Sequence, residues 1–354
     1  MDVVDWEVAR AVAVRIAGQE PFSQSYHRQS LSDELPRIAV RAEELVAECT
    51  DLRTVDRARV RVVDRAEWIE TNIRSFRRLL RPLLERMRER LASNPLAVLT
   101  GRATATELGL VLGWMSTRVL GQYDVMVPDE EVAGDEVLFV APNILAMERA
   151  FAFPPSEFRM WVALHELTHR AQFVGVGWLR PHYLRLVDEL VQRIEPDAEQ
   201  FRDLLLRCVE ALRSGRNPLA DGGFVALALD ERQRETLDRL TGMLAFLEGH
   251  GDVTMNRAAE GVVSSAPRFH RVLAERRKSA SPLVKLVRRL TGLEAKLAQY
   301  ELGEKFIAAV EAQGGPELLR KVWDGPEMLP TMREIRDPET WIRRVEHRAA
   351  PAAR

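Results

Sequence analysis

Two histidines and a glutamate form the pattern His-Glu-x-x-His at His165, Glu166 and His169. Residues four apart lie about one turn apart on an α-helix, so the two imidazoles share a face and can bind one metal ion. Imidazole nitrogens at this spacing are typical zinc ligands, and a glutamate directly after the first histidine can act as general base on a zinc-activated water. The pattern therefore predicts a catalytic zinc site.

A catalytic zinc ion usually takes three protein ligands, so a third must come from elsewhere in the chain. The extended pattern with a third histidine is absent, because Gln172 and Gly175 occupy the positions of its glycine and its last histidine. Glu248 is the best candidate, with His250 as an alternative ligand in its place. Asp252 lies four residues after Glu248, so the two share a face if the helix continues through both, and Asp252 could then accept a hydrogen bond from a liganding histidine. Both acids could instead be ordinary surface residues near a helix end.

The elements that must position these residues are mainly helical, because apolar residues recur at three- and four-residue spacing over most of the chain. The histidine pattern lies in a helix expected to begin near Pro155 and to end at Gly175 and Gly177. Breaks are expected at Gly249 and Gly251 and at 314–316. Further helices are expected over roughly 73–91, 104–120, 181–213, 231–247, 255–275, 282–313 and 316–323.

Two short runs, 123–128 and 137–142, are rich in residues that favour β-strands. They predict a small antiparallel hairpin before the histidine-bearing helix, and the strand from Val137 could bind an extended substrate by edge pairing. Gly109 and Gly113 lie four residues apart in a predicted helix. They indicate a close crossing with a neighbouring element.

The stretches 119–124, 142–144, 158–173, 247–250 and 296–300 resemble a family of zincin-like metallopeptidases, found mainly in high-GC Gram-positive bacteria and their relatives. Its members are often labelled as associated with deazaflavin coenzyme biosynthesis. The resemblance covers most of the chain and implies a mainly α (α+β) zincin-like fold with zinc as cofactor. Carried over by position, it implies His165 and His169 as ligands, Glu166 as general base and Glu248 as third ligand. The chain departs from the usual glutamate zincins in the long segment before Glu248 and in Leu247, where they carry asparagine.

The composition argues against several other classes of protein. The 354 residues include 51 basic and 53 acidic side chains, with a formal net charge of -2, so no strong positive field favours a nucleic-acid or membrane partner. Cys49 and Cys208 are expected to be buried thiols in a reducing cytoplasm. The N-terminus does not resemble a signal peptide and no apolar run could span a bilayer, so a cytoplasmic protein is expected. Sequence patterns of phosphate-binding loops and serine hydrolases are also absent.

These observations predict a hydrolase that cleaves peptide bonds in a peptide or protein substrate. Zinc would polarise the scissile carbonyl and a water molecule, and Glu166 would move the proton of the water to the leaving amine. His250 and Tyr300 are candidates for stabilising the oxyanion. Two alternatives remain: a non-catalytic zinc protein that binds a partner, and a hydrolase of small amides. The expected organisation is an N-terminal helical portion over 1–120, a catalytic portion over 121–345 and a frayed tail over 346–354, packed as one compact unit.

Overall fold

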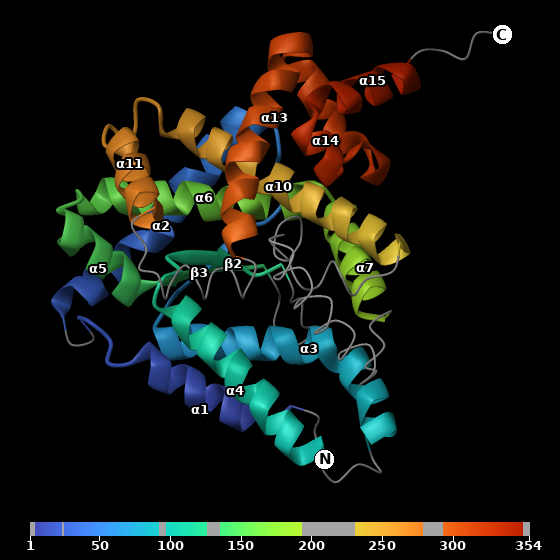
Figure 1. The fold of residues 1–354 in the computed structure, drawn as a ribbon. Helices are drawn as coiled ribbons and strands as arrows, with labels where there is room; N and C mark the ends of the chain where they lie inside the picture. The colour runs from blue at the N-terminus through green and yellow to red at the C-terminus, as the bar shows by residue number, and fades with distance from the viewer. Residues whose placement is uncertain are drawn as a thin grey trace. The chain divides into compact units, whose positions relative to one another are not determined.

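The structure is a computed structural model, and it is mainly helical with one three-stranded sheet (Figure 1). It describes residues 4–22, 25–91, 97–125, 135–192, 231–278 and 293–349. The chain divides into two compact units, Met1–Gly175 with Thr254–Ala274 and Val176–Val253 with Glu275–Arg354. One of the three boundaries passes through helix α10 (Glu231–Ala259), so this helix belongs to both units. The expected portions 1–120 and 121–345 have other boundaries.

The sheet of the first unit has the strand order β1-β3-β2. Its strands are β1 (Arg59–Val63), β2 (Gly121–Tyr123) and β3 (Glu136–Val140). The pair β2-β3 is antiparallel, as predicted, but β2 shares only Tyr123 with the predicted run 123–128, and β3 ends at Val140, before the end of the predicted run 137–142. Strand β1 pairs with β3 in parallel and was not predicted. Because β3 is paired on both sides, the expectation that the strand from Val137 offers an edge to substrate is wrong. The edge strands are β1 and β2.

Helices cover both faces of this sheet, which is why residues 137–140 of β3 are all fully buried. On one face, Leu138 and Val140 join a core with Trp68 and Ile69 of α3. On the other face, α6 contacts β2 and β3, and α2 packs against α6 (Figure 1). The helices of this unit are α1 (Trp6–Ala17), α2 (Tyr26–Thr50), α3 (Arg65–Leu91), α4 (Ala97–Ser116), α5 (Ala141–Phe151), α6 (Pro155–Gly175) and α11 (Ala266–Lys278) up to Ala274.

The predicted close crossing at Gly109 and Gly113 is confirmed, and the neighbour is α1. A Cβ atom on either glycine would lie 2.5 Å from a backbone oxygen, that of Ala9 for Gly109 and that of Ala13 for Gly113. Real Cβ atoms do not approach oxygen this closely. The two glycines therefore allow the backbones of α1 and α4 to touch.

The second unit contains α7, the first part of α10, and a C-terminal group of helices. Its remaining elements are α7 (Leu179–Gln192), α13 (Leu293–Arg320), η1 (Lys321–Asp324), η2 (Pro326–Met328), α14 (Met332–Arg336) and α15 (Pro338–Ala349). The predicted break at Gly315 is confirmed by its left-handed φ of 67° within α13. The predicted break at Gly249 and Gly251 is wrong, because α10 continues through both. A Cβ on Gly249 would lie 2.4 Å from the carbonyl carbon of Gly303, so this glycine serves a close crossing of α10 with α13.

Several smaller expectations can be compared with the structure. Helix α15 extends to Ala349, so the expected frayed tail does not begin at 346. Cys49 is exposed rather than buried, and Cys208 and the predicted helical residues 193–213 lie outside the described residues. No helix in the described ranges has both the length and the apolar character needed to cross a membrane.

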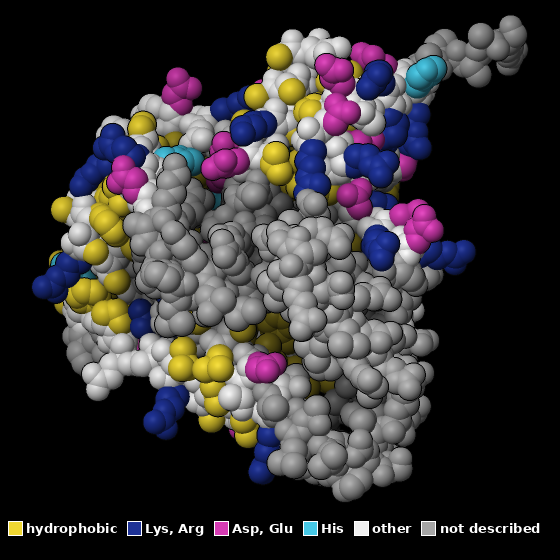
Figure 2. Space-filling model, in the orientation of Figure 1, with side chains coloured by type: hydrophobic (Ala, Val, Ile, Leu, Met, Phe, Trp, Pro, Cys, Tyr) yellow, Lys and Arg dark blue, Asp and Glu magenta, His cyan; other side chains and the backbone are white. Residues whose placement is uncertain are grey.

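Charged side chains lie intermixed over the C-terminal helices, as Figure 2 shows for one face of the molecule. Arg344, for example, contacts Glu334 at 2.6 Å. This mixture agrees with the nearly balanced charge of the sequence.

Candidate metal centre

Two buried arginines hold α6 on either side of its histidines. The guanidinium of Arg159 donates hydrogen bonds to both carboxylate oxygens of Glu148, at 2.8 and 3.0 Å, and to Glu34 at 2.8 Å. Burial by itself lowers the pKa of Arg159, but the contacts with the two glutamates outweigh burial and raise the pKa overall. Arg170, only 1% exposed, donates to Glu43 at 2.7 Å. Since a buried guanidinium is stable only with its carboxylates in place, the pairs fix the rotation of α6 and the direction of its histidine face.

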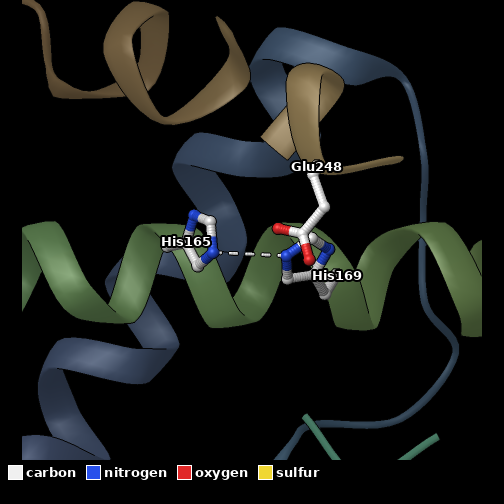
Figure 3. Close-up of side chains that lie close together, drawn as sticks. All are labelled: His165, His169 and Glu248. Carbon is white, nitrogen blue, oxygen red and sulfur yellow. Dashed lines mark hydrogen bonds between the residues drawn. The ribbon is translucent and has the colours of Figure 1, made fainter. Parts of the chain in front are cut away.

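His165 and His169 converge on this face, as the sequence pattern predicts. Their Nε2 atoms lie 3.3 Å apart, and the two rings are nearly perpendicular, at 86°. Glu248 of α10 directs its carboxylate toward them (Figure 3). One ligand atom from each of the three side chains lies within 4.8 Å of the others. Among the described residues, this is the group of histidine, cysteine and acidic side chains able to hold a metal ion.

Gln172 contacts one of these histidines, His169, and sequence reasoning missed the contact. Its Oε1 atom lies 3.0 Å from Nδ1 of His169, and its side chain is fully buried. The two residues are three apart on α6, a spacing at which helical side chains meet. The spacing was therefore visible in the sequence, but nothing there showed which way the amide points.

Glu166 lies between α6 and the edge strand β2. Its Oε2 atom accepts a hydrogen bond of 3.1 Å from the backbone N–H of Tyr123, and its side chain is 8% exposed. A Cβ atom on Gly121 would lie 2.6 Å from Cγ of Glu166, so the glycine makes room for this side chain. The strand therefore fixes the glutamate that was predicted to act as general base.

Three further residues were predicted to take part in the site: His250, Asp252 and Tyr300. His250 is buried and its ring packs against Trp323, with ring centroids 5.2 Å apart and an interplanar angle of 88°. The structure does not bring it into the group of His165, His169 and Glu248. Asp252 is buried, and its hydrogen bond to a liganding histidine stays a prediction. Tyr300 belongs to α13, but its side chain is outside the described residues, so its role also stays a prediction.

Comparison with known proteins identifies the class to which this fold and site belong. A family model described as zincin-like metallopeptidase matches residues 4–342, and the chain therefore belongs to this family. The structure is also similar to the crystal structure of a protein from Chloroflexus aurantiacus, described as a candidate hydrolase with a novel fold. The sequences are 32% identical, the TM-score is 0.69, and the match covers 97% of this chain and 99% of the other. No curated protein matches the sequence. Family membership implies a metal ion, and both comparisons support a hydrolase.

Proposed function

We propose that this protein is a zinc-dependent hydrolase that cleaves peptide bonds. The observation that carries the proposal is the convergence of His165, His169 and Glu248, whose ligand atoms lie within 4.8 Å of one another. Two imidazole nitrogens and one carboxylate oxygen are a common donor set of catalytic zinc sites, which keep a further position for water or substrate. The residues present therefore fit the metal that the family implies.

Each side chain of the site has a role in this proposal. His165, His169 and Glu248 hold the ion, and a bound zinc ion supplies Lewis-acid polarisation of a carbonyl group and of a water molecule. Glu166 is the general base: its Oε1 atom accepts a proton from the water and passes it to the leaving nitrogen. The amide of Tyr123 holds Oε2 of the same carboxylate, so the base is oriented before substrate binds.

The position of β2 favours a peptide as substrate. Within the described part of the sheet, β2 pairs with β3 along one side only. An extended peptide can add to an exposed strand edge through main-chain hydrogen bonds. The Tyr123 amide on this edge is already taken by Glu166, so a peptide would pair through the other edge groups of the strand and would lie beside the general base. This assignment replaces the strand from Val137 as the proposed binding edge.

The substitution Glu166→Gln tests the catalytic role. Glutamine keeps the size of the side chain but cannot accept the proton, so the variant should bind zinc normally and hydrolyse about 10²–10⁴-fold more slowly. Wild type and variant, each loaded with one zinc ion per chain, are incubated with a diverse peptide library, and new termini are read by mass spectrometry. His169→Ala provides the control that loses the metal.

Equal cleavage by wild type and the zinc-loaded Glu166→Gln variant would exclude Glu166 as the base. Absence of cleavage by zinc-loaded wild type over the whole library would count against peptide hydrolysis. A small-amide hydrolase or a non-catalytic zinc protein would then replace the proposal.

A further inference from the structure

Gln172 is the one fully buried amide that the structure places against a predicted metal ligand in the described part of α6. It follows His169 by three residues, at the position where the extended zinc pattern carries glycine. A glycine there could make no side-chain contact with the imidazole. The glutamine adds an acceptor at 3.0 Å from Nδ1.

The contact acts on the chemistry of the imidazole. A neutral imidazole carries its proton on one nitrogen and offers a lone pair on the other. A carbonyl oxygen beside Nδ1 of His169 favours the tautomer with the proton on Nδ1, and this leaves the lone pair on Nε2. The Nε2 atom is the one that faces His165, at 3.3 Å. The hydrogen bond also restrains rotation of the ring about its Cβ–Cγ bond.

We propose that Gln172 is a positioning residue that fixes the tautomer and the ring orientation of His169 for metal binding. The inference rests on the proposed zinc site and extends it to a residue outside the His-Glu-x-x-His pattern. Residues that hydrogen-bond to liganding histidines typically contribute about 10–100-fold to metal affinity. The acceptor here is neutral, so Gln172 orients the ligand without adding charge to the centre.

The affinity of the full-length protein for Zn²⁺, measured by competition with a chromogenic chelator, tests the proposal. Gln172→Met keeps the length of the side chain but removes the acceptor, and it should weaken zinc binding about 10–100-fold. Gln172→Glu restores an acceptor and should return the affinity to within about threefold of wild type or above it.

A matched control separates this effect from a general loss of packing. Thr168 is also fully buried on α6, and its hydroxyl donates to the carbonyl of Leu164 at 2.7 Å, not to an imidazole. Thr168→Val should leave the zinc affinity unchanged even if it lowers the free energy of unfolding. An affinity of Gln172→Met within about threefold of wild type, or an equal loss in Thr168→Val, would overturn the role of Gln172.

A second measurement needs neither a buried substitution nor bound metal. Side-chain nitrogen chemical shifts of the metal-free wild-type protein, assigned with a His169→Ala variant, report the tautomer of His169. We expect the proton on Nδ1, and a dominant tautomer with the proton on Nε2 would overturn the inference. Failure of wild type to bind Zn²⁺ would instead refute the proposed metal site, so the two failures can be told apart.

Discussion

Gly121 provides the space that the Glu166 side chain occupies. A Cβ atom at this position would lie 2.6 Å from Cγ and 2.9 Å from Cδ of the glutamate. Both carbon atoms belong to a side chain that the Tyr123 amide holds in place, so it cannot swing away without losing that hydrogen bond. The position of the proposed base thus depends on the absence of a side chain at position 121 in β2.

The variant Gly121→Ala should therefore lower the free energy of unfolding of the metal-free protein by about 1–3 kcal/mol, the usual cost of an added methyl group in a packed site. Gly177→Ala is the control, since a Cβ there would meet no atom within 4 Å. It should change stability by less than about 1 kcal/mol. Urea unfolding curves of the three proteins give the comparison. Equal stability of Gly121→Ala and wild type would show that Glu166 is free to move.

Individual residues were predictable from the sequence where their relation is local. His165 and His169 converge because helical spacing alone brings them to one face. Glu248 lies on a distant helix, so the sequence could offer it only as a candidate beside His250. The packing of His250 against Trp323 was out of reach, because no periodicity links residues so far apart in the chain.

Within the second unit, α10 and α13 cross closely at the residue that follows Glu248. A Cβ atom on Gly303 would lie 2.1 Å from the carbonyl oxygen of Ala245, and Gly249 meets Gly303 from the opposite helix. Gly249 directly follows Glu248 in the sequence. Close contact between the two backbones therefore fixes the helical turn that carries the proposed third ligand.

Gly303→Ala should force the two helices apart and lower the free energy of unfolding by at least about 1–3 kcal/mol. Ala308→Ser changes an exposed position of the same helix and should alter stability by no more than about 0.5 kcal/mol. Thermal and urea unfolding of both variants distinguish the two positions. A Gly303→Ala protein as stable as Ala308→Ser would show that the crossing is looser than described.

This crossing also explains an incorrect prediction. Glycine costs about 1 kcal/mol in a helix interior, so Gly249 and Gly251 were expected to break the helix. Tertiary packing against α13 outweighs that local preference. The strand β1 was missed for a related reason, since its parallel pairing with β3 joins residues 59–63 to 136–140 and leaves no local signal.

The stability of the molecule should depend on pH through His182. Burial, followed by the positive charges of Arg185 and Arg239, lowers the pKa of His182 below its usual value. Arg185 donates a hydrogen bond of 2.7 Å to Nδ1 of this ring, which requires the ring to be neutral. The folded protein therefore binds a proton at His182 less readily than the unfolded chain does.

The sign of the effect follows from this difference. As the pH falls below the unfolded pKa of about 6.5, the unfolded chain takes up a proton first, and the free energy of unfolding decreases until the folded pKa is passed. His182→Gln should remove this part of the pH dependence. Urea unfolding of the metal-free proteins between about pH 8 and pH 5 measures it, and an unchanged slope in the variant would contradict the assignment.

For the whole chain, the mainly helical character could be predicted from periodicity, and the zincin-like class from the resemblance of several stretches to that family. The match over residues 4–342 confirms the class. The division into units could not be predicted. Its first boundary follows Gly175, where a helix end was expected, but the other two pass through the continuous helices α10 and α11, and no composition change or linker marks them in the sequence.

The central claim is that His165, His169 and Glu248 together bind zinc, and anomalous diffraction from crystals of the zinc-loaded protein tests it most directly. A difference map at the zinc absorption edge should show one peak per chain, bonded to both histidine Nε2 atoms and to the Glu248 carboxylate at about 2.0–2.2 Å. A peak bonded to His250 in place of Glu248, or one away from His165 and His169, would contradict the account.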